Sequence, residues 1–97
     1  MKAHKSIMVA PEDWDECCLC GNRAEACHHV FGGPNRQISE REGFTVPLCN
    51  RCHNMSPKAV HFNHNLDRFL KRWAQTKYEQ RGHKREEFIK LIGRNYL

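Results

Sequence analysis

Residues 17–53 read CCLCGNRAEACHHVFGGPNRQISEREGFTVPLCNRCH, and this stretch decides the fold. It begins with one Cys-x2-Cys pair, Cys17 and Cys20, and ends with a second, Cys49 and Cys52. Two such pairs can place four thiolates in a tetrahedron at about 2.3 Å from one zinc ion, and a closed site of this kind contributes folding free energy directly. The sequence therefore predicts a structural zinc site held by these four cysteines.

The tandem histidines His28 and His29 lie between the two pairs, and His53 directly follows the second pair. The 28 residues between the pairs exceed the usual spacing of a zinc ribbon, so we expect an insert that carries the tandem. Neighbouring side chains of a strand point to opposite faces, so one histidine can bind a second metal while the other stays free as a base. Two or three protein ligands would leave that metal open to water and a phosphate. Surface positions are expected for His4 and His83.

The 97 residues allow one small domain, which often needs a metal or disulfides for stability. The N-terminal residues contain only a four-residue apolar run, at 7–10, and so predict neither a signal peptide nor a membrane span. In a reducing cytoplasm, paired Cys-x2-Cys motifs favour zinc over disulfides. We therefore expect a cytoplasmic protein, in which the two remaining cysteines, Cys18 and Cys27, are buried thiols.

The net charge of +5 lies entirely in the last third of the chain. Residues 66–97 hold nine Lys/Arg and four Asp/Glu, whereas residues 1–65 hold seven of each. This asymmetry is typical of a surface that contacts phosphates, although a solvated helix face has the same composition.

Short apolar runs predict strands over residues 24–31 and 44–48, with a further short strand possible at 6–10. A polar loop is expected over residues 35–43. Ser56-Pro57 is a helix-start signal, and a second start lies at Asn63 or Asn65. The helix that follows should end near Gly82 and pack its apolar stripe in the core, and a last helix should be stopped by Gly93. The stripe consists of Leu66, Phe69, Leu70, Trp73, Ala74 and Tyr78.

The motifs CCLCG, EACHHVFGG and VPLCNRCHN, the last leading into a helix, resemble the HNH endonucleases. That resemblance covers residues 17–65, about half of the chain. The segments GGPNRQISE, VHFN and IGRNYL are similar to small HNH-type proteins of bacteriophages and prophages. The resemblance implies an α+β fold with a zinc-stabilised ββα-metal finger over residues 17–65, a peripheral segment at 1–16, and a basic helical extension at 66–97.

The resemblance also implies roles for the histidines. His28 falls at the first metal ligand of the family, His29 at the general base and His53 at the ligand after the second cysteine pair. His61, eight residues further on, is a candidate third ligand. The family's central asparagine has no counterpart at residues 44–46; Asn35 is our preferred substitute because the insert must be braced above the site, with the alternatives Asn50, Asn54 and Asn63.

The implied activity is metal-assisted hydrolysis of DNA, which leaves a 5′ phosphate and a 3′ hydroxyl. Imidazole ligands fit zinc, nickel or manganese, whereas the family suggests Mg²⁺ or Mn²⁺. DNA contacts are expected from Arg68, Lys71, Arg72 and Gln75 on one helix face, and from Arg36, with binding that weakens steeply with salt. No constellation that reads bases is visible.

Two other functions remain open on the sequence. One is a zinc-knuckle module that binds nucleic acid without catalysis, although such a module has no need of a spare base. The other is an accessory factor for a phage terminase or recombination machine, which would keep the scaffold and bind only the structural zinc. Phage packaging or recombination proteins are the expected protein partners.

Overall fold

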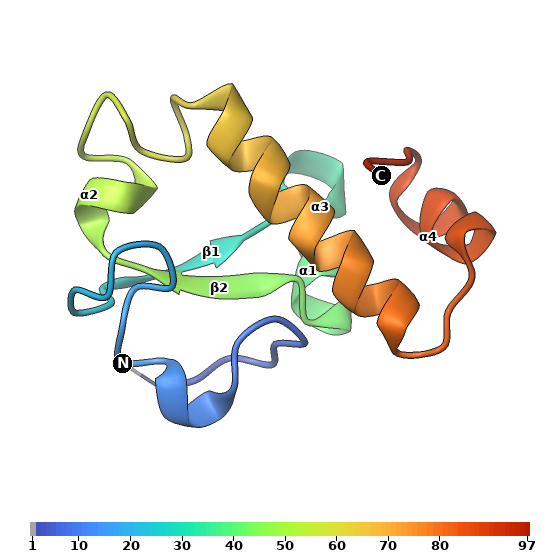
Figure 1. Cartoon of the computed structure of the whole chain (residues 1–97), viewed down its shortest axis with the longest axis horizontal. Helices are drawn as coiled ribbons and strands as arrows, with labels where there is room; N and C mark the ends of the chain where they lie inside the picture. Colours follow the sequence, from blue (N-terminus) through green and yellow to red (C-terminus); the bar gives the residue numbers. More distant parts are fainter. Residues whose placement is uncertain (1) are drawn as a thin grey trace.

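The computed structural model describes residues 2–97 and shows a small α+β domain with a two-stranded sheet and four α-helices in that range. The elements follow one another in the order η1 (Pro11–Asp13), β1 (Ala26–His29), η2 (Gly33–Asn35), α1 (Arg36–Glu42), β2 (Thr45–Leu48), α2 (Asn50–His53), α3 (His64–Gln80) and α4 (Arg85–Ile92). In Figure 1, α3 crosses the molecule on one side of the sheet, and the N-terminal segment lies on the other.

The strands β1 and β2 pair antiparallel, with His28 opposite Val46 and His29 opposite Thr45. Both strands lie within the predicted ranges but are shorter, since β1 covers only the central four residues of 24–31. All four residues of β2 are buried, because the strand has core on one face and the N-terminal segment on the other. The pairing with β2 thereby fixes the positions of His28 and His29 relative to the core.

The polar loop expected over residues 35–43 is wrong, because this segment forms helix α1. The buried hydroxyl of Ser39 accepts a hydrogen bond from Phe31 N (3.0 Å) and donates one to Phe31 O (2.8 Å). Gly43, at φ +84°, ends the helix in the left-handed region that glycine adopts without strain. A polar segment thus becomes helical because it is anchored to the end of the preceding strand.

The further short strand at residues 6–10 does not form. Ile7 N donates to Gly43 O, while the hydroxyl of Ser6 donates to Thr45 O and that of Thr45 donates to Lys5 O. Side-chain hydroxyls therefore supply most of the hydrogen bonds along this edge of β2, and no backbone ladder is built.

The helix start predicted at Ser56-Pro57 is also wrong, since only turns follow α2 there. The start predicted at Asn63 is confirmed: its side-chain oxygen accepts from Leu66 N (3.1 Å), which satisfies a free amide of the first turn of α3. Gly93, at φ +99°, ends α4 as predicted.

Among residues 2–97, one hydrophobic core combines residues of the N-terminal segment, of the region around the sheet and of α3 and α4, with Met8, Val30, Phe44, Leu70 and Phe88 as members. The ring of Phe44 is central, with centroids 5.8 Å from Tyr78 and 6.1 Å from Phe88. Helices α3 and α4 therefore contribute side chains to the core itself.

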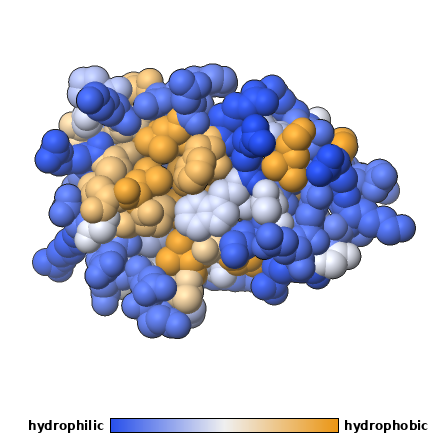
Figure 2. All heavy atoms as spheres, in the orientation of Figure 1, coloured by the Kyte–Doolittle hydropathy of each residue, from blue (hydrophilic) through white to orange (hydrophobic). Residues whose placement is uncertain are grey.

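The face of the molecule seen in Figure 2 carries an apolar area among polar side chains. A groove of about 480 Å³ lies beside α3 and the first cysteine pair, and it is lined by Cys18, Phe69, Arg72, Trp73, Thr76 and Leu97. Among the residues that the structure describes, no helix combines the length and apolar character needed to cross a bilayer.

Candidate metal centres

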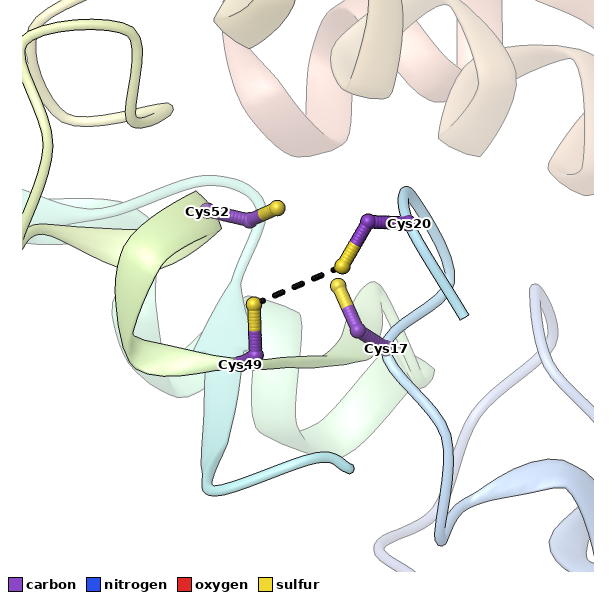
Figure 3. Close-up of side chains that lie close together, drawn as sticks. All are labelled: Cys17, Cys20, Cys49 and Cys52. Carbon is purple, nitrogen blue, oxygen red and sulfur yellow. Dashed lines mark hydrogen bonds between the residues drawn. The ribbon is translucent and has the colours of Figure 1, made fainter. Parts of the chain in front are cut away.

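Four cysteines from the two pairs converge at one point, as Figure 3 shows. Their sulfur atoms all lie within 4.8 Å of one another, and Cys20 Sγ is 3.5 Å from Cys49 Sγ. In a tetrahedron with bonds of about 2.3 Å, sulfurs are about 3.8 Å apart, so these positions fit one zinc ion. The group consists of Cys17, Cys20, Cys49 and Cys52.

Local backbone geometry builds each half of this cluster. In the first pair, Gly21 at φ +80° turns the chain, and its amide donates to Cys17 O (2.9 Å). In the second pair, Cys49 lies at the start of α2, so that one helical turn brings Cys52 back towards it. Glu25 bonds both the backbone and side-chain nitrogens of Asn50, which fixes the first residue of α2 to the chain before β1.

The thiols themselves favour a cation between them. Burial raises the pKa of Cys17, but hydrogen bonds from backbone amides outweigh it and lower that pKa to about 7. Burial, followed by interactions with the neighbouring thiols, raises the pKa of Cys52 far above its ordinary value. Four neighbouring thiolates repel one another, and a divalent cation between them would neutralise their charge. The four cysteines could therefore hold a structural zinc ion.

Three histidines form a second group that could hold a metal ion: His28 from β1, His53 from the end of α2 and His61 from the loop before α3. One ring nitrogen of each lies within 4.8 Å of those of the other two, and His53 Nε2 is 2.9 Å from His61 Nε2. The ring centroid of His28 lies 5.3 Å from each of the other two. Strand β1, helix α2 and the loop before α3 thus bring three imidazole rings together.

His28 shows most directly that this group fits a metal. Its side chain is only 6% exposed, and Nε2 is buried with no hydrogen-bond partner among the described residues. Burial, reinforced by the positive fields of His53 and His61, lowers its pKa to about 3, so the ring is neutral at physiological pH. A buried polar atom without a partner is costly, and a neutral imidazole nitrogen facing two others is a suitable metal donor.

Two of these histidines, His28 and His61, line a cavity of about 560 Å³. Its walls include His29, Asn63, His64, Asp67 and Lys71. Lys71 Nζ lies 2.8 Å from Asp67 Oδ2, so its charge is paired with a carboxylate. The cavity therefore combines candidate metal donors with an ion pair between Lys71 and Asp67.

His29 is adjacent to His28 in the chain, and its ring is hydrogen-bonded to a carboxylate. Its Nε2 is 2.5 Å from Glu40 Oε2 on α1, and this hydrogen bond lowers the pKa of Glu40. Sequence reasoning missed Glu40 because residues 35–43 were expected to form a loop. The glycine at residue 43, directly after seven residues of mostly helix-forming types, was the available signal for a helix.

Asn35 is not at the cavity. Its side-chain amide donates to Ile92 O (3.0 Å), so it braces the end of α4. Of the alternatives, Asn50 is bonded to Glu25, and Asn63 lines the cavity but accepts from the first turn of α3.

The basic residues expected to share one face of α3 are separated in the structure. Gln75, which should lie at the centre of that face, is fully buried. Lys71 faces the histidine cavity, whereas Arg72 lines the apolar groove. Arg68 and, at the start of α1, Arg36 are exposed.

Neither remaining cysteine is fully buried, contrary to prediction, since Cys18 and Cys27 are partly exposed. Burial nevertheless raises their pKa values, to about 12 for Cys18 and about 11 for Cys27. Both are therefore protonated, unreactive thiols at neutral pH.

In comparisons with models of protein families, with curated proteins and with solved structures, this chain has no match.

Proposed function

We propose that this protein is a metal-dependent endonuclease of the HNH type that hydrolyses phosphodiester bonds in DNA. The observation that carries the proposal is the unpartnered, buried Nε2 of His28, whose ring lies 5.3 Å from the rings of His53 and His61. His29, directly after His28, has its own carboxylate partner. A set of metal donors next to a separate base is what hydrolysis of a phosphodiester requires, and a structural role needs no such base.

The order of elements supports a ββα-metal finger. A hairpin of β1 and β2 leads directly into α2, with His28 on the first strand and His53 on the helix. Helix α1 is inserted between the strands, and the cysteine cluster clamps the start of the hairpin to α2. The resemblance of residues 17–65 to HNH motifs agrees with this reading.

In the proposed reaction each side chain has a defined task. His28, His53 and His61 would hold a divalent metal, which, when bound, supplies Lewis-acid stabilisation of the charge that develops on the phosphate oxygens. His29 accepts a proton from the attacking water. Lys71, which pairs with Asp67 in the free protein, would turn its ammonium to the phosphate and oppose its negative charge.

The proposed substrate is DNA, because the excess positive charge of the chain lies in residues 66–97 and Lys71 from that part reaches the cavity. Exposed Arg68 on the same helix extends the positive surface beyond the cavity. Such contacts bind the backbone without reading sequence, so a phage packaging or recombination partner would direct the cut.

The test is cleavage of supercoiled plasmid with Mg²⁺, Mn²⁺, Ni²⁺ or Zn²⁺ by the wild type, by His29→Ala and by His64→Ala. His64 lines the same cavity but is not one of the three metal donors, so its variant is the matched control. We expect nicked or linear product from the wild type and the control, and a rate lower by about 10²- to 10⁴-fold from His29→Ala. Equal rates for all three proteins would contradict the assigned base.

One observation favours the accessory-factor alternative, namely that Asn35 is bonded to Ile92 and does not brace the site. No cleavage with any metal, together with one tightly held zinc per chain, would contradict the nuclease and favour the non-catalytic binding module or the accessory factor.

A further inference from the structure

The contact between His29 and Glu40 has a defined polarity. An ionised carboxylate can only accept hydrogen bonds, so Nε2 of His29 must carry the proton that lies between them. The other ring nitrogen, Nδ1, then carries a lone pair in the neutral ring. Within residues 2–97, Nε2 is the only ring nitrogen of His29 with a hydrogen-bond partner, and His29 lines the cavity.

The fold holds Glu40 firmly in this place. The residue before it, Ser39, is fully buried, and its hydroxyl makes two hydrogen bonds to the backbone of Phe31, two residues after His29. The second carboxylate oxygen of Glu40 lies 3.5 Å from His4 Nδ1, and the His4 ring stacks on Trp14 at 5.5 Å. Helix α1 and the N-terminal segment thus fix the carboxylate from two sides.

We propose that Glu40 is a positioning residue that keeps His29 in the tautomer protonated at Nε2, so that Nδ1 is the atom that receives the proton from water. This inference rests on the proposed nuclease function. As the O–H bond of water breaks, its electron pair forms the new P–O bond and the proton forms the N–H bond at Nδ1. The bond from phosphorus to the 3′ oxygen breaks, and that oxygen leaves as the alcohol after taking a proton from solvent.

The helix supplies a matched control for this role. Glu42, two residues further along α1, pairs with Arg41 (3.1 Å) and makes no contact with His29. Glu40→Gln and Glu42→Gln therefore remove the same charge from the same helix, and only the first changes the partner of His29. Both side chains have exposed area, so neither substitution should unfold the protein, which circular dichroism would verify.

The first measurement is the tautomer itself, read from the ¹⁵N chemical shifts of the His29 ring in zinc-loaded protein. We expect the Nε2–H form in the wild type and in Glu42→Gln, and a mixture of both forms in Glu40→Gln, since an amide can donate to Nε2 as well as accept from it. An Nδ1–H ring in the wild type, or a tautomer unchanged by Glu40→Gln, would overturn the proposal.

The second measurement separates positioning from substrate binding. Glu40→Gln should lower kcat for plasmid nicking by about 10- to 10⁴-fold and leave KM unchanged, whereas Glu42→Gln should leave both unchanged. A change in KM alone would contradict the role. A wild-type chain that cuts no DNA would overturn the nuclease proposal, and the tautomer measurement would still decide whether Glu40 controls His29.

Discussion

His61 Nε2 lies 2.9 Å from His53 Nε2, although His53 is the last residue of α2 and His61 belongs to the loop before α3. The backbone enforces the approach, since Val60 N donates to Cys52 O (2.7 Å) and His61 N donates to His53 O (3.3 Å). The cysteine pair that builds the first cluster therefore also positions two members of the second. The cysteine cluster and the histidine cluster therefore share one structural unit.

His61→Ala should weaken metal binding at the histidine cluster by more than about 100-fold, because it removes a donor rather than a partner of a donor. The measurement is a Co²⁺ titration followed by its visible absorption, in protein whose cysteine site already holds zinc. His64→Ala is the control and should bind as the wild type does, because His64 lines the cavity without joining the donor group. Equal affinities for the two variants would exclude His61 as a ligand.

Cys52→Ser should abolish cooperative folding. Structural zinc contributes about 10–16 kcal/mol in small zinc-binding domains, which exceeds the total stability of about 5–15 kcal/mol typical of a domain. Zinc content per chain and thermal unfolding by circular dichroism would measure the effect. Cys27→Ser, outside the cluster, should keep its zinc and its transition, and retention of both by Cys52→Ser would contradict the site.

The stability of protein that carries only the structural zinc should fall between pH 6.5 and 5.5. The folded pKa of His28, about 3, is below its ordinary value of 6.5, so the unfolded chain takes up the proton first. The contribution of His28 is therefore fully present above pH 6.5 and is lost as the pH falls toward 3, by about 1 kcal/mol over the first unit. Urea unfolding at several pH values would show this slope, and His28→Leu should reduce it; an unchanged slope would contradict the shift.

Gln75→Ala should lower the free energy of unfolding by about 1–3 kcal/mol. The buried amide donates to Glu79 and Asn95 and accepts from Tyr96 N, each at 2.8 Å. Its loss removes the acceptor of the Tyr96 amide, whereas Glu79 keeps its contact with Arg85 and Asn95 keeps its hydrogen bond from Leu97 N. Gln80→Ala, at the exposed end of the same helix, should change stability by less than about 0.5 kcal/mol. Urea unfolding measures both, and similar values for the two would show that the network adds nothing.

Lys71→Gln should weaken DNA binding, because Lys71 is the lysine that lines the histidine cavity. The slope of the logarithm of the binding constant against the logarithm of the salt concentration should fall by about one. Binding of a labelled duplex would be followed by fluorescence anisotropy from about 50 to about 200 mM salt, in a His29→Ala background that does not cut. Lys77→Gln removes the same charge from the same helix, but Lys77 does not line the cavity. An unchanged slope for Lys71→Gln would show that no phosphate reaches this lysine.

Local signals predicted much of the fold. The spacing of the cysteines indicated their cluster, and Asn63 and Gly93 marked helix ends because capping depends on a few neighbouring residues. The helix start predicted at Ser56-Pro57 was wrong because a local signal alone does not make a helix. The hydroxyl of Ser56 bonds Lys58 N within a turn, and no apolar stripe follows to bury a helix there.

By itself, the sequence determined the four cysteines, the two strands and the two long C-terminal helices, since all of these depend on spacing and periodicity within short segments. Only the tertiary structure decided that His61 joins His28 and His53, that Glu40 holds His29, and that Gln75 is buried while Lys71 reaches the cavity. These relationships depend on how α1 and α3 pack against the sheet. Such packing follows from contacts between residues far apart in the chain, which no local pattern contains.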